Sequence, residues 1–559
     1  MQSHDKARQT PESSSGVTGM SGIPRVVRMG TTSQLLVDGA PYLAVGGELH
    51  NSSPSSPAYM APIWDRLQRN GVPSVIGAAS WQLVEPEEGT YDFTAVDDQI
   101  EQARVRGMRL ILIWFGSYKN ADSAYSPTWV RRDEQRFPRA ERDPERLLTG
   151  RFSIDGPVLS VFSEDLLQAD AGAFAVFMRH LREVDPQHTV IAVQVQNEVG
   201  LLGDSRDRSP LAETAWAAPV PAELLSGLSE RGDRLHSWVR DMWARHGSRT
   251  EGTWAEVFGP GRDAEEVFMS WAFSRFVGQV AEAGTSEYPL PVYTNAWLGP
   301  QPNAQEPGQY PSGGPVARMI DVWQIGAPGL AFLSPDIYID DFEGTLTDYS
   351  AAGNPVFVPE ARPDAGLLFV TIGRFRGIGF HPFGIEDVPD GDDLFDAYAA
   401  IQGMQGIITQ AQAGGAIQGF RVDSGQEERI SLGGYDISIT GPLDTRGMFG
   451  EGTGSAATSL TGYGLVIQAA PDEFIVVARG ASFHFSRPDA IAELDTLTEG
   501  EYRDGQWTAR RILNGDERYY MFPKDKLRTV RIELLRRSGG TVESSTESIP
   551  KPDSITVVA

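Results

Sequence analysis

Short apolar, β-branched runs alternate with helical patterns from about residue 42 to residue 390. Such alternation is typical of βα units that build a parallel sheet. In two of the helical stretches apolar residues recur at i, i+3, i+4 and i+7 or nearly so; these are Met60, Ile63, Trp64 and Leu67, and Phe174, Phe177, Met178 and Leu181. The strand-like runs are Leu43–Gly47, Ser74–Ala79, Leu110–Trp114, Val190–Val195, Pro291–Asn295, Pro335–Ile339, Val356–Glu360 and Gly377–Phe380. Eight such strands predict an α/β fold, a (β/α)8 TIM barrel.

The pattern changes after about residue 412, where glycine-rich segments separate short strand-like runs. The glycines lie at Gly414–Gly415, Gly433–Gly434 and Gly450–Gly454; Phe474–Val477 reads as a strand, and Ile555–Val558 as a further pairing strand. We therefore expect a barrel over residues 23–412, with a helical insertion around residues 200–287, and a smaller β-rich C-terminal domain over residues 413–559. Residues 1–22, rich in Ser, Gly, Thr and charge, are expected to form a disordered tail.

Composition and charge exclude several classes of function. The 559-residue chain has a formal net charge of −27, which repels phosphate backbones and anionic membranes but suits a neutral substrate such as a sugar. The absence of cysteine excludes disulfides, thiol nucleophiles and cysteine-ligated zinc. No apolar run approaches the roughly 20 residues that span a bilayer, so we expect no membrane insertion, and the first 22 residues contain no signal-peptide core.

The fourth strand-like run ends in polar residues, Gln194-Val-Gln-Asn-Glu198. With a two-residue period, Gln194, Gln196 and Glu198 share one face, and the valines Val193 and Val195 share the other. A strand of this kind suits a barrel interior that becomes polar toward its mouth. Because barrel enzymes carry their catalytic groups at the carboxyl ends of strands, Glu198 is predicted to project into the mouth.

The seventh run ends at Pro359-Glu360. The same period predicts that Val356 and Val358 fill barrel layers below Glu360, and Pro359 removes a ladder donor where pairing ends. Glycoside hydrolysis needs one carboxylic acid that protonates the leaving oxygen and one carboxylate across the anomeric carbon. Either glutamate alone is an ordinary strand-end surface group, but together on strands four and seven they predict a glycosidase pair.

Asn197-Glu198 and Glu360 resemble the arrangement in clan A retaining glycoside hydrolases. Gly46–His50, Trp81–Phe93 and Leu110–Asn120 resemble the first three strand ends of family 35 β-galactosidases, and Glu499–Trp507 resembles the β-rich C-terminal domain of a bacterial branch. Some members of that branch act on galactose side chains of plant xyloglucan. The resemblance implies a retaining, exo-acting β-galactosidase without a cofactor, and it favours the periplasm or the cell exterior.

The resemblance also assigns roles residue by residue. Glu198 becomes the acid/base and Glu360 the nucleophile, while Asn197 hydrogen-bonds the sugar 2-hydroxyl and Tyr338 contacts the nucleophile. Lys119 and Asn120 stand where the family grips galactose, although Tyr-Lys-Asn replaces the Asn-Ala-Glu-like run of many members.

Other residues keep two interpretations. Glu48 binds a sugar hydroxyl or holds the barrel rim, and Trp114 and Trp297 stack on sugar or belong to the core. His50 and Glu85 are expected to be structural. A metal site at His381, Asp336 and Glu360 is not expected, because no His-x-His or His-Glu-x-x-His spacing occurs.

Alternative functions share much of this pattern. A β-glucosidase, an arabinosidase or an endo-glycanase of clan A would carry the same glutamate pair, and a non-catalytic carbohydrate-binding barrel is a further alternative. The sequence does not decide between exo and endo action, and it gives no oligomeric state. Only Trp507 of the twelve tryptophans lies after residue 391, so the C-terminal domain is expected to be a structural cover rather than a sugar-binding module.

Overall fold

A closed ring of parallel strands forms the centre of the molecule. The computed structural model describes residues 22–148, 156, 158–442, 461–518 and 522–538. In chain order the ring consists of β4 (Ala44–Val45) with β5 (Gly47–Glu48), β6 (Ser74–Ser80), β7 (Arg109–Lys119), β8 (Val190–Asn197), β9 (Val292–Trp297), β10 (Phe332–Ile337), β11 (Phe357–Val358) with β12 (Glu360–Ala361), and β13 (Gly379–Phe380). The eight predicted runs coincide with these strands, and the predicted TIM barrel is confirmed.

The first and seventh strands are each broken, and these breaks let the ring close. β5 pairs with β6 whereas β4 pairs with β13; β12 pairs with β10 whereas β11 pairs with β13. The break at Gly46 needs glycine, because a Cβ there would lie 1.8 Å from the carbonyl oxygen of Ser74.

The break at Pro359 overturns the predicted alternation of the seventh strand. Phe357, not Val356 or Val358, packs in the barrel interior, where its ring lies 5.2 Å from that of Tyr293. Val356 and Val358 belong instead to the large cluster that includes the surrounding helices. Because pairing is interrupted at Pro359, the two-residue period does not carry through to Glu360.

An antiparallel sheet closes the amino-terminal end of the barrel, and the strand pattern did not predict it. It consists of β1 (Arg25–Met29), β2 (Thr32–Val37) and β3 (Ala40–Tyr42). Leu35 and Val37 pack with Ile76, Ile111 and Ile191 from the lowest part of the barrel interior. The opposite, carboxyl-terminal end is thereby left as the mouth.

Helices surround the barrel, and their apolar faces follow the predicted spacing. Met60, Trp64 and Leu67 are buried on α1, and Phe174 and Phe177 are buried on α5. The helices are α1 (Pro57–Arg69), α2 (Trp81–Val84), α3 (Thr94–Val105), α4 (Thr128–Arg132), α5 (Glu164–Val184), α11 (Ile320–Gly326), α12 (Phe342–Ser350), α13 (Ala365–Phe369) and α14 (Asp393–Gly414). Between β8 and β9 lie α6 (Pro210–Ala217), α7 (Ala222–Arg231), α8 (Ser237–Arg245), α9 (Trp254–Phe258) and α10 (Arg262–Glu287).

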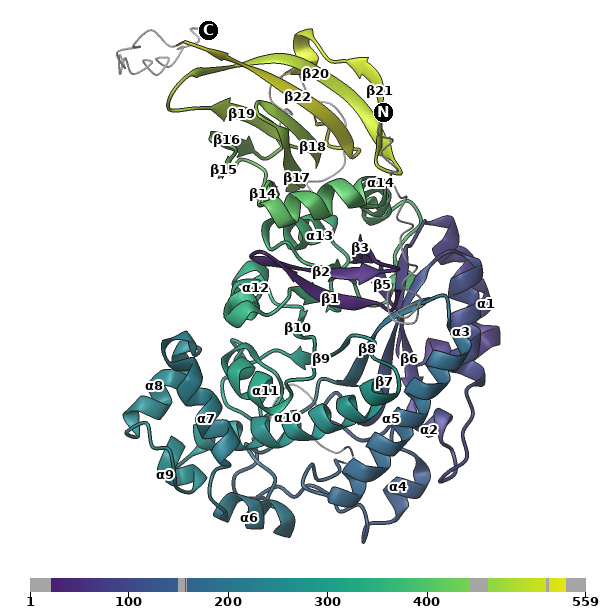
Figure 1. Cartoon of the computed structure of the whole chain (residues 1–559), viewed down its shortest axis with the longest axis vertical. Coiled ribbons are helices and arrows are strands. Elements are labelled where there is room, and N and C mark those ends of the chain that lie inside the picture. The colour runs from purple at the N-terminus through teal and green to yellow at the C-terminus, as the bar shows by residue number, and fades with distance from the viewer. Residues whose placement is uncertain (1–21, 149–155, 157, 443–460, 519–521, 539–559) are drawn as a thin grey trace, which may run out of the picture.

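The C-terminal region consists of two antiparallel sheets that follow α14. One has the order β14 (Ile417–Asp423), β17 (Thr461–Ala470), β18 (Glu473–Arg479), β22 (Arg528–Arg537), β20 (Ile491–Arg503), β21 (Gln506–Ile512); the other pairs β15 (Glu427–Leu432), β16 (Tyr435–Thr440) and β19 (Ser482–Ser486). This region and helices α6–α9 lie on opposite sides of the barrel (Figure 1). The predicted β-rich C-terminal region is thereby confirmed.

Leu465 and Ile467 of β17 share a hydrophobic cluster with Phe369 of α13 and with the barrel helices, so the sheets are packed on the barrel. The predicted tail at residues 1–22 (apart from Gly22), Gly450–Gly454 and the strand near Ile555–Val558 lie outside the described residues. Within the ranges that the structure covers, no helix is long and apolar enough to cross a membrane.

Candidate active site

Glu198 follows β8 directly and is held by its backbone at the mouth of the barrel. Its N–H donates to Oδ1 of Asn295 at 2.8 Å, and its carbonyl accepts from the N–H of Ala121 at 3.1 Å. Its φ of +46° lies in the left-handed region, which a non-glycine residue adopts only when its surroundings impose it. The side chain is 8% exposed. These neighbours from β9 and from the segment after β7 therefore fix the direction of the Glu198 side chain.

Gln196 departs from the predicted alternation of this strand. Its φ is +63°, and its amide donates to Asp170 of α5 at 2.7 Å, outside the barrel. Val193 and Val195 do face the helices, as the period predicts. The backbone twist at Gln196 resets the alternation, so that Asn197 and Glu198 both reach the mouth.

Glu360 begins β12 and receives hydrogen bonds from two neighbouring side chains. The hydroxyl of Tyr338 donates to Oε2 at 3.0 Å, and the amide of Asn197 donates to Oε1 at 3.4 Å. Tyr338 itself is 40% exposed, so its ring lies at the edge of the mouth. Asn197 thus joins strand four, which carries Glu198, to the carboxylate on strand seven.

Lys119 ends β7 and brings a positive charge beside this pair. Its Nζ donates to Oδ1 of Asn197 at 3.0 Å and also donates to Oδ1 of Asn120. The same Nζ lies 5.2 Å from the centre of the Phe115 ring. Asn120 is exposed, and its backbone N–H donates to the carbonyl of Asn197. Lys119 and Asn120 therefore belong to the same hydrogen-bonded group as Asn197 and Glu360.

Burial and mutual repulsion raise the pKa values of three acids in the mouth. Burial, followed by the charge of Glu360, raises the pKa of Glu198 to about 7, although Lys119 and a hydrogen bond with Asp336 lower it in part. Burial and the Glu360 charge also raise the pKa of Glu48 and of Asp336 well above their ordinary values. A carboxyl group with a pKa near 7 can hold a proton at neutral pH and release it to a leaving group.

Glu48 is the most enclosed of these acids. Its side chain is 1% exposed, and within the described part of the chain neither carboxylate oxygen has a hydrogen-bond partner. Buried polar atoms are rarely left unpaired in folded proteins. Glu48 therefore requires a partner that the described side chains do not supply, and its part in sugar binding stays a prediction.

Asp336 and Asn295 complete the site, and the sequence pattern did not assign them to it. The amide of Asn295 donates to Oδ2 of Asp336 at 2.6 Å, and burial together with the charges of Glu360 and Glu198 raises the pKa of Asp336 well above its ordinary value. Both residues lie in strand-like runs, where a buried polar side chain near the carboxyl end is the signal that could have found them. On the sequence pattern, Asp336 is considered only for a metal site with His381 and Glu360, and that site is not expected.

Trp114 does not reach the site, and its assignment to substrate binding is corrected. Its indole Nε1 donates to Oδ1 of Asp170 at 2.7 Å, and its ring packs on Phe174 and Phe177 of α5. Alternation along β7 turns Phe115 into the barrel and Trp114 toward the helices. Trp297, by contrast, ends β9 beside Asp336 and is partly exposed, so its part in sugar binding stays a prediction.

Three residues with other expected roles lie away from the glutamate pair. His50 pairs with Asp387 at 2.7 Å, and Glu85 accepts hydrogen bonds from Trp81 and Gly89. His381 is buried and bonded to Ser74, and burial lowers its pKa to about 3. Among the residues with described placement, no group of three His, Asp or Glu side chains is arranged to hold a metal ion.

Residues 60–282, which include Lys119, Asn197 and Glu198, match the family model described as Beta-galactosidase, glycoside hydrolase family 42. Residues 394–524 match a domain of unknown function, DUF5597. A curated Beta-galactosidase from Xanthomonas manihotis is 29% identical over 180 residues, which are 31% of this chain and 26% of that protein. The chain thus matches about a quarter of the length of that curated relative.

Solved structures were also compared with this fold. The β-galactosidase of Halorubrum lacusprofundi is 18% identical over 61% of this chain and 52% of its own, with a TM-score of 0.38. The catalytic domain of the β-amylase of Paenibacillus polymyxa is 11% identical over 66% of this chain and 98% of its own, with a TM-score of 0.42. The assignment of the TIM barrel therefore rests on the strand order given above.

The barrel and its acidic mouth thus occur together with a stretch, residues 60–282, that matches the β-galactosidase family model over less than half of the chain. The matched model is that of family 42, so the comparisons support the resemblance at the level of β-galactosidases and not of family 35.

Proposed function

We propose that this chain is a retaining, exo-acting β-galactosidase that releases terminal β-D-galactose from neutral oligo- or polysaccharides. The observation that carries the proposal is the pair of glutamates at the ends of strands four and seven, linked through Asn197 and placed in different surroundings. Burial and the charge of Glu360 raise the pKa of Glu198 to about 7, while Tyr338 and Asn197 donate hydrogen bonds to the Glu360 carboxylate. Such a pair supplies one acid and one nucleophile.

In the first step the Glu360 carboxylate attacks the anomeric carbon. An ester bond forms between Glu360 and the sugar, and the bond to the leaving oxygen breaks. The proton of Glu198 passes to that oxygen, so the leaving group departs as a neutral alcohol. Tyr338 and Asn197 keep the nucleophilic oxygens in place through their hydrogen bonds.

In the second step the charge on Glu360 is gone, because its carboxylate is now an ester. The pKa of Glu198 then falls, since the largest electrostatic contribution that raises it has disappeared. Glu198, now ionised, takes a proton from a water molecule, whose oxygen attacks the anomeric carbon. The ester bond breaks, galactose leaves with its β configuration, and the Glu360 carboxylate is restored.

The remaining side chains are proposed to bind the sugar. Glu48 offers two unpartnered carboxylate oxygens, which suit hydroxyl groups as donors. Lys119, Asn120 and Asn197 form one hydrogen-bonded group beside Glu360, and the Asn197 amide is suited to the 2-hydroxyl. Placement in family 35 and a location outside the cytoplasm stay predictions of the resemblance.

A panel of nitrophenyl glycosides tests the proposed activity. We expect the β-galactoside to be hydrolysed with a kcat/KM at least tenfold above the β-glucoside and the α-arabinoside. The Glu360→Gln variant is the matched control, because it keeps the shape of the side chain and removes the nucleophilic oxygen. A preference for another sugar would replace the β-galactosidase by a different glycosidase, and hydrolysis that survives in Glu360→Gln would refute the proposed nucleophile.

A further inference from the structure

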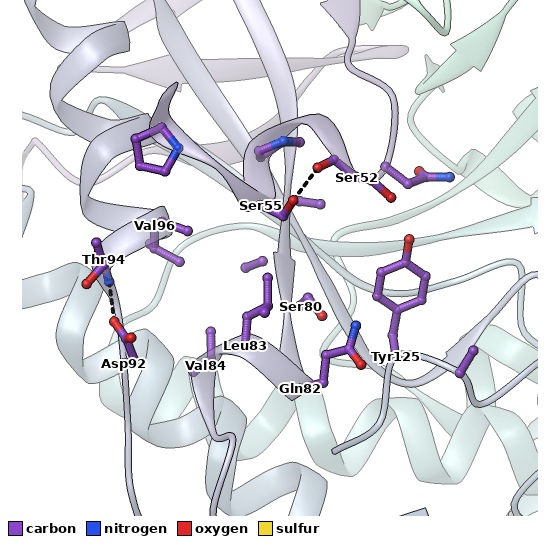
Figure 2. Close-up of a pocket in the computed structure, with 17 residues that line it drawn as sticks. Ser52, Ser55, Ser80, Gln82, Leu83, Val84, Asp92, Thr94, Val96 and Tyr125 are labelled. Carbon is purple, nitrogen blue, oxygen red and sulfur yellow. Dashed lines mark hydrogen bonds between the residues drawn. The ribbon is translucent and has the colours of Figure 1, made fainter. Parts of the chain in front are cut away.

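A pocket of about 610 Å³ lies at the carboxyl end of β6, outside the group of acids described above. Its size falls within the range of about 300–1,000 Å³ that is usual for small-molecule sites. Figure 2 shows Gln82 and Tyr125 on one side of the pocket and Asp92, Thr94 and Val96 on the other, with Ser52 and Ser55 above. Neither the proposed reaction nor the comparisons give this pocket a role.

The segment Trp81–Phe93, which the sequence singles out by its resemblance, supplies part of the wall of this pocket. The segment is held from below by Glu85, which accepts hydrogen bonds from the indole of Trp81 and from the N–H of Gly89, each at 2.8 Å. The indole of Trp129 also donates to the Glu85 carbonyl, at 3.1 Å. These bonds hold the segment rigidly and present Gln82 and the 42% exposed Leu83 to the pocket.

The lining suits an uncharged, hydroxyl-bearing ligand. Hydroxyl and amide groups from Asn51, Ser80, Gln82 and Tyr125 stand beside apolar side chains, and no lysine or arginine of the described residues lines the pocket. Asp92 is the one carboxylate that the described residues place in the lining, and it already accepts a hydrogen bond from the N–H of Thr94 at 2.9 Å. A site that mixes apolar surface with a few neutral polar groups fits a sugar ring better than an anion, and the net charge of −27 also disfavours an anion.

Two polar atoms in this lining lack a protein partner. Oγ of Ser80 and Oδ1 of Asn51 are buried, and within the described residues they make no hydrogen bond. Because both atoms are buried, neither is open to the pocket. The polar groups that a ligand in the pocket can reach are therefore the amide of Gln82 and the hydroxyl of Tyr125.

The pocket is connected to the candidate active site through the segment Lys119–Tyr125. Lys119 bonds Asn197, and Ala121 donates to the carbonyl of Glu198. Four residues later, Tyr125 lines the pocket and packs its ring 4.8 Å from Phe115, the ring beneath the Lys119 amine. The pocket therefore adjoins the side of the mouth that is formed by Phe115 and Lys119.

We propose that this pocket binds a neutral sugar unit of the leaving group when the terminal galactose lies between Glu198 and Glu360. The inference rests on the proposed glycosidase function and adds a substrate class to it, neutral oligosaccharides. Hydroxyl groups of that unit pair with Gln82, and its apolar ring face lies on Leu83 and the Tyr125 ring.

The kinetic test fills the pocket without touching the acids. Ala95 lines the pocket, so Ala95→Trp is expected to raise KM for a neutral trisaccharide ending in β-galactose at least tenfold, while kcat/KM for nitrophenyl β-galactoside changes less than twofold. Ala222→Trp, on the exposed start of α7, is the matched control and should change neither value. Leu83→Ala, a change at an exposed side chain, should raise the trisaccharide KM about threefold if Ala95→Trp fails to fold. Equal effects on the two substrates would overturn the proposal.

A binding measurement separates this pocket from the proposed reaction. Isothermal titration of the trisaccharide is made into Glu360→Gln and into Glu360→Gln with Ala95→Trp. Binding that weakens at least tenfold in the double variant supports the pocket, even if no glycoside is hydrolysed and the proposed function fails. Equal affinity in both variants overturns the pocket, and it does so even if aryl galactosides are hydrolysed as proposed.

Discussion

Glu198 and Glu360 differ in what surrounds their carboxyl groups, and this difference assigns their proposed roles. Glu360 accepts hydrogen bonds from the hydroxyl of Tyr338 and from the amide of Asn197. Glu198 is buried beside that charge, and its pKa rises to about 7. The two carboxyl groups are chemically identical. The proposed roles of acid and nucleophile therefore follow from the different environments of these groups.

Substitution of each glutamate should have a different kinetic signature. Glu360→Gln removes the nucleophile, and we expect kcat to fall at least about 10³-fold on every substrate. Glu198→Ala removes proton transfer, worth about 10²–10⁴-fold for a poor leaving group, and should cost much less on an activated nitrophenyl galactoside. Steady-state kinetics on alkyl and nitrophenyl galactosides checks both, and equal losses on the two substrates in Glu198→Ala would contradict its role as the acid.

The pH dependence of activity should report the pKa of Glu198. Because the acid must be protonated, kcat/KM for a poor leaving group is expected to decline above about pH 7. Asp336 lowers the pKa of Glu198, so Asp336→Leu should move this alkaline limb to higher pH. Asp336→Asn keeps a donor and should move it less. An alkaline limb that stays in place in both variants would show that Asp336 does not act on Glu198.

The raised pKa of Glu198 also makes the free energy of unfolding depend on pH. The pKa of Glu198 is raised from 4.5 to about 7 in the folded protein, so the unfolded chain ionises first as the pH rises. Its contribution to stability is therefore fully present below pH 4.5 and is lost as the pH rises through about 7. Denaturant titrations between pH 4.5 and about pH 7 measure this loss. As the pH rises, the free energy of unfolding should decrease less in Glu198→Gln than in the wild type.

At the scale of elements, the strands could be predicted from the sequence, and their interruptions could not. The apolar runs fix where strands lie, because each is buried on both sides in a barrel. The breaks at Gly46 and Pro359 depend on which neighbour each half pairs with, which is a property of the closed ring. The position of Glu360 at the end of the seventh strand could therefore be predicted. The prediction that Val356 and Val358 fill the barrel below it was wrong, because the break at Pro359 turns Phe357 into the barrel instead.

The break at Gly46 gives a prediction about stability. Gly46→Ala would bring a Cβ within 1.8 Å of the Ser74 carbonyl oxygen, so we expect the free energy of unfolding to fall by about 1–3 kcal/mol or more. Gly172 in α5 has nothing within 4 Å of an added Cβ, and Gly172→Ala should be neutral or stabilise by up to about 1 kcal/mol. Urea denaturation of the two variants checks this, and a Gly46→Ala variant as stable as Gly172→Ala would contradict the close approach.

Site residues were predictable when they sit in a sequence motif and not when only the fold brings them together. Glu198 stands in a motif at a strand end, and so does Lys119. Asp336 and Asn295 acquire their meaning from β9 and β10 lying side by side next to β8, which places their side chains against Glu198. The prediction that Trp114 binds substrate was wrong, because successive side chains of β7 point alternately into the barrel and toward the helices.

At the scale of the whole molecule, the barrel and the C-terminal sheets share one hydrophobic cluster. Leu465 of β17 is 1% exposed and packs against Gly373, in the π-helical turn Val370–Arg374 that follows α13. The sheets extend away from α13 and α14, on the side opposite helices α6–α9 (Figure 1). This arrangement favours a structural role for the C-terminal sheets over a sugar-binding one.

This shared cluster predicts that damage to the sheets destabilises the barrel. Leu465→Ala should lower the free energy of unfolding by about 2–5 kcal/mol. The temperature of unfolding and the temperature of thermal inactivation should then fall together, by equal numbers of degrees. Ile512→Ala, at an exposed side chain of β21, is the control and should change neither. Circular dichroism and residual activity after heating measure the two temperatures. Unchanged inactivation in Leu465→Ala would mean that the barrel is stable independently of the sheets.

The central claim is that Glu198 and Glu360 act as a retaining pair on β-galactosides, and the configuration of the first-formed sugar tests it most directly. Proton NMR of nitrophenyl β-galactoside during hydrolysis separates the two galactose anomers before they interconvert. The proposed two-step mechanism predicts that β-galactose appears first and α-galactose only later, by mutarotation. Early α-galactose would mean inversion through a single displacement by water, and it would contradict the role of Glu360 as the nucleophile.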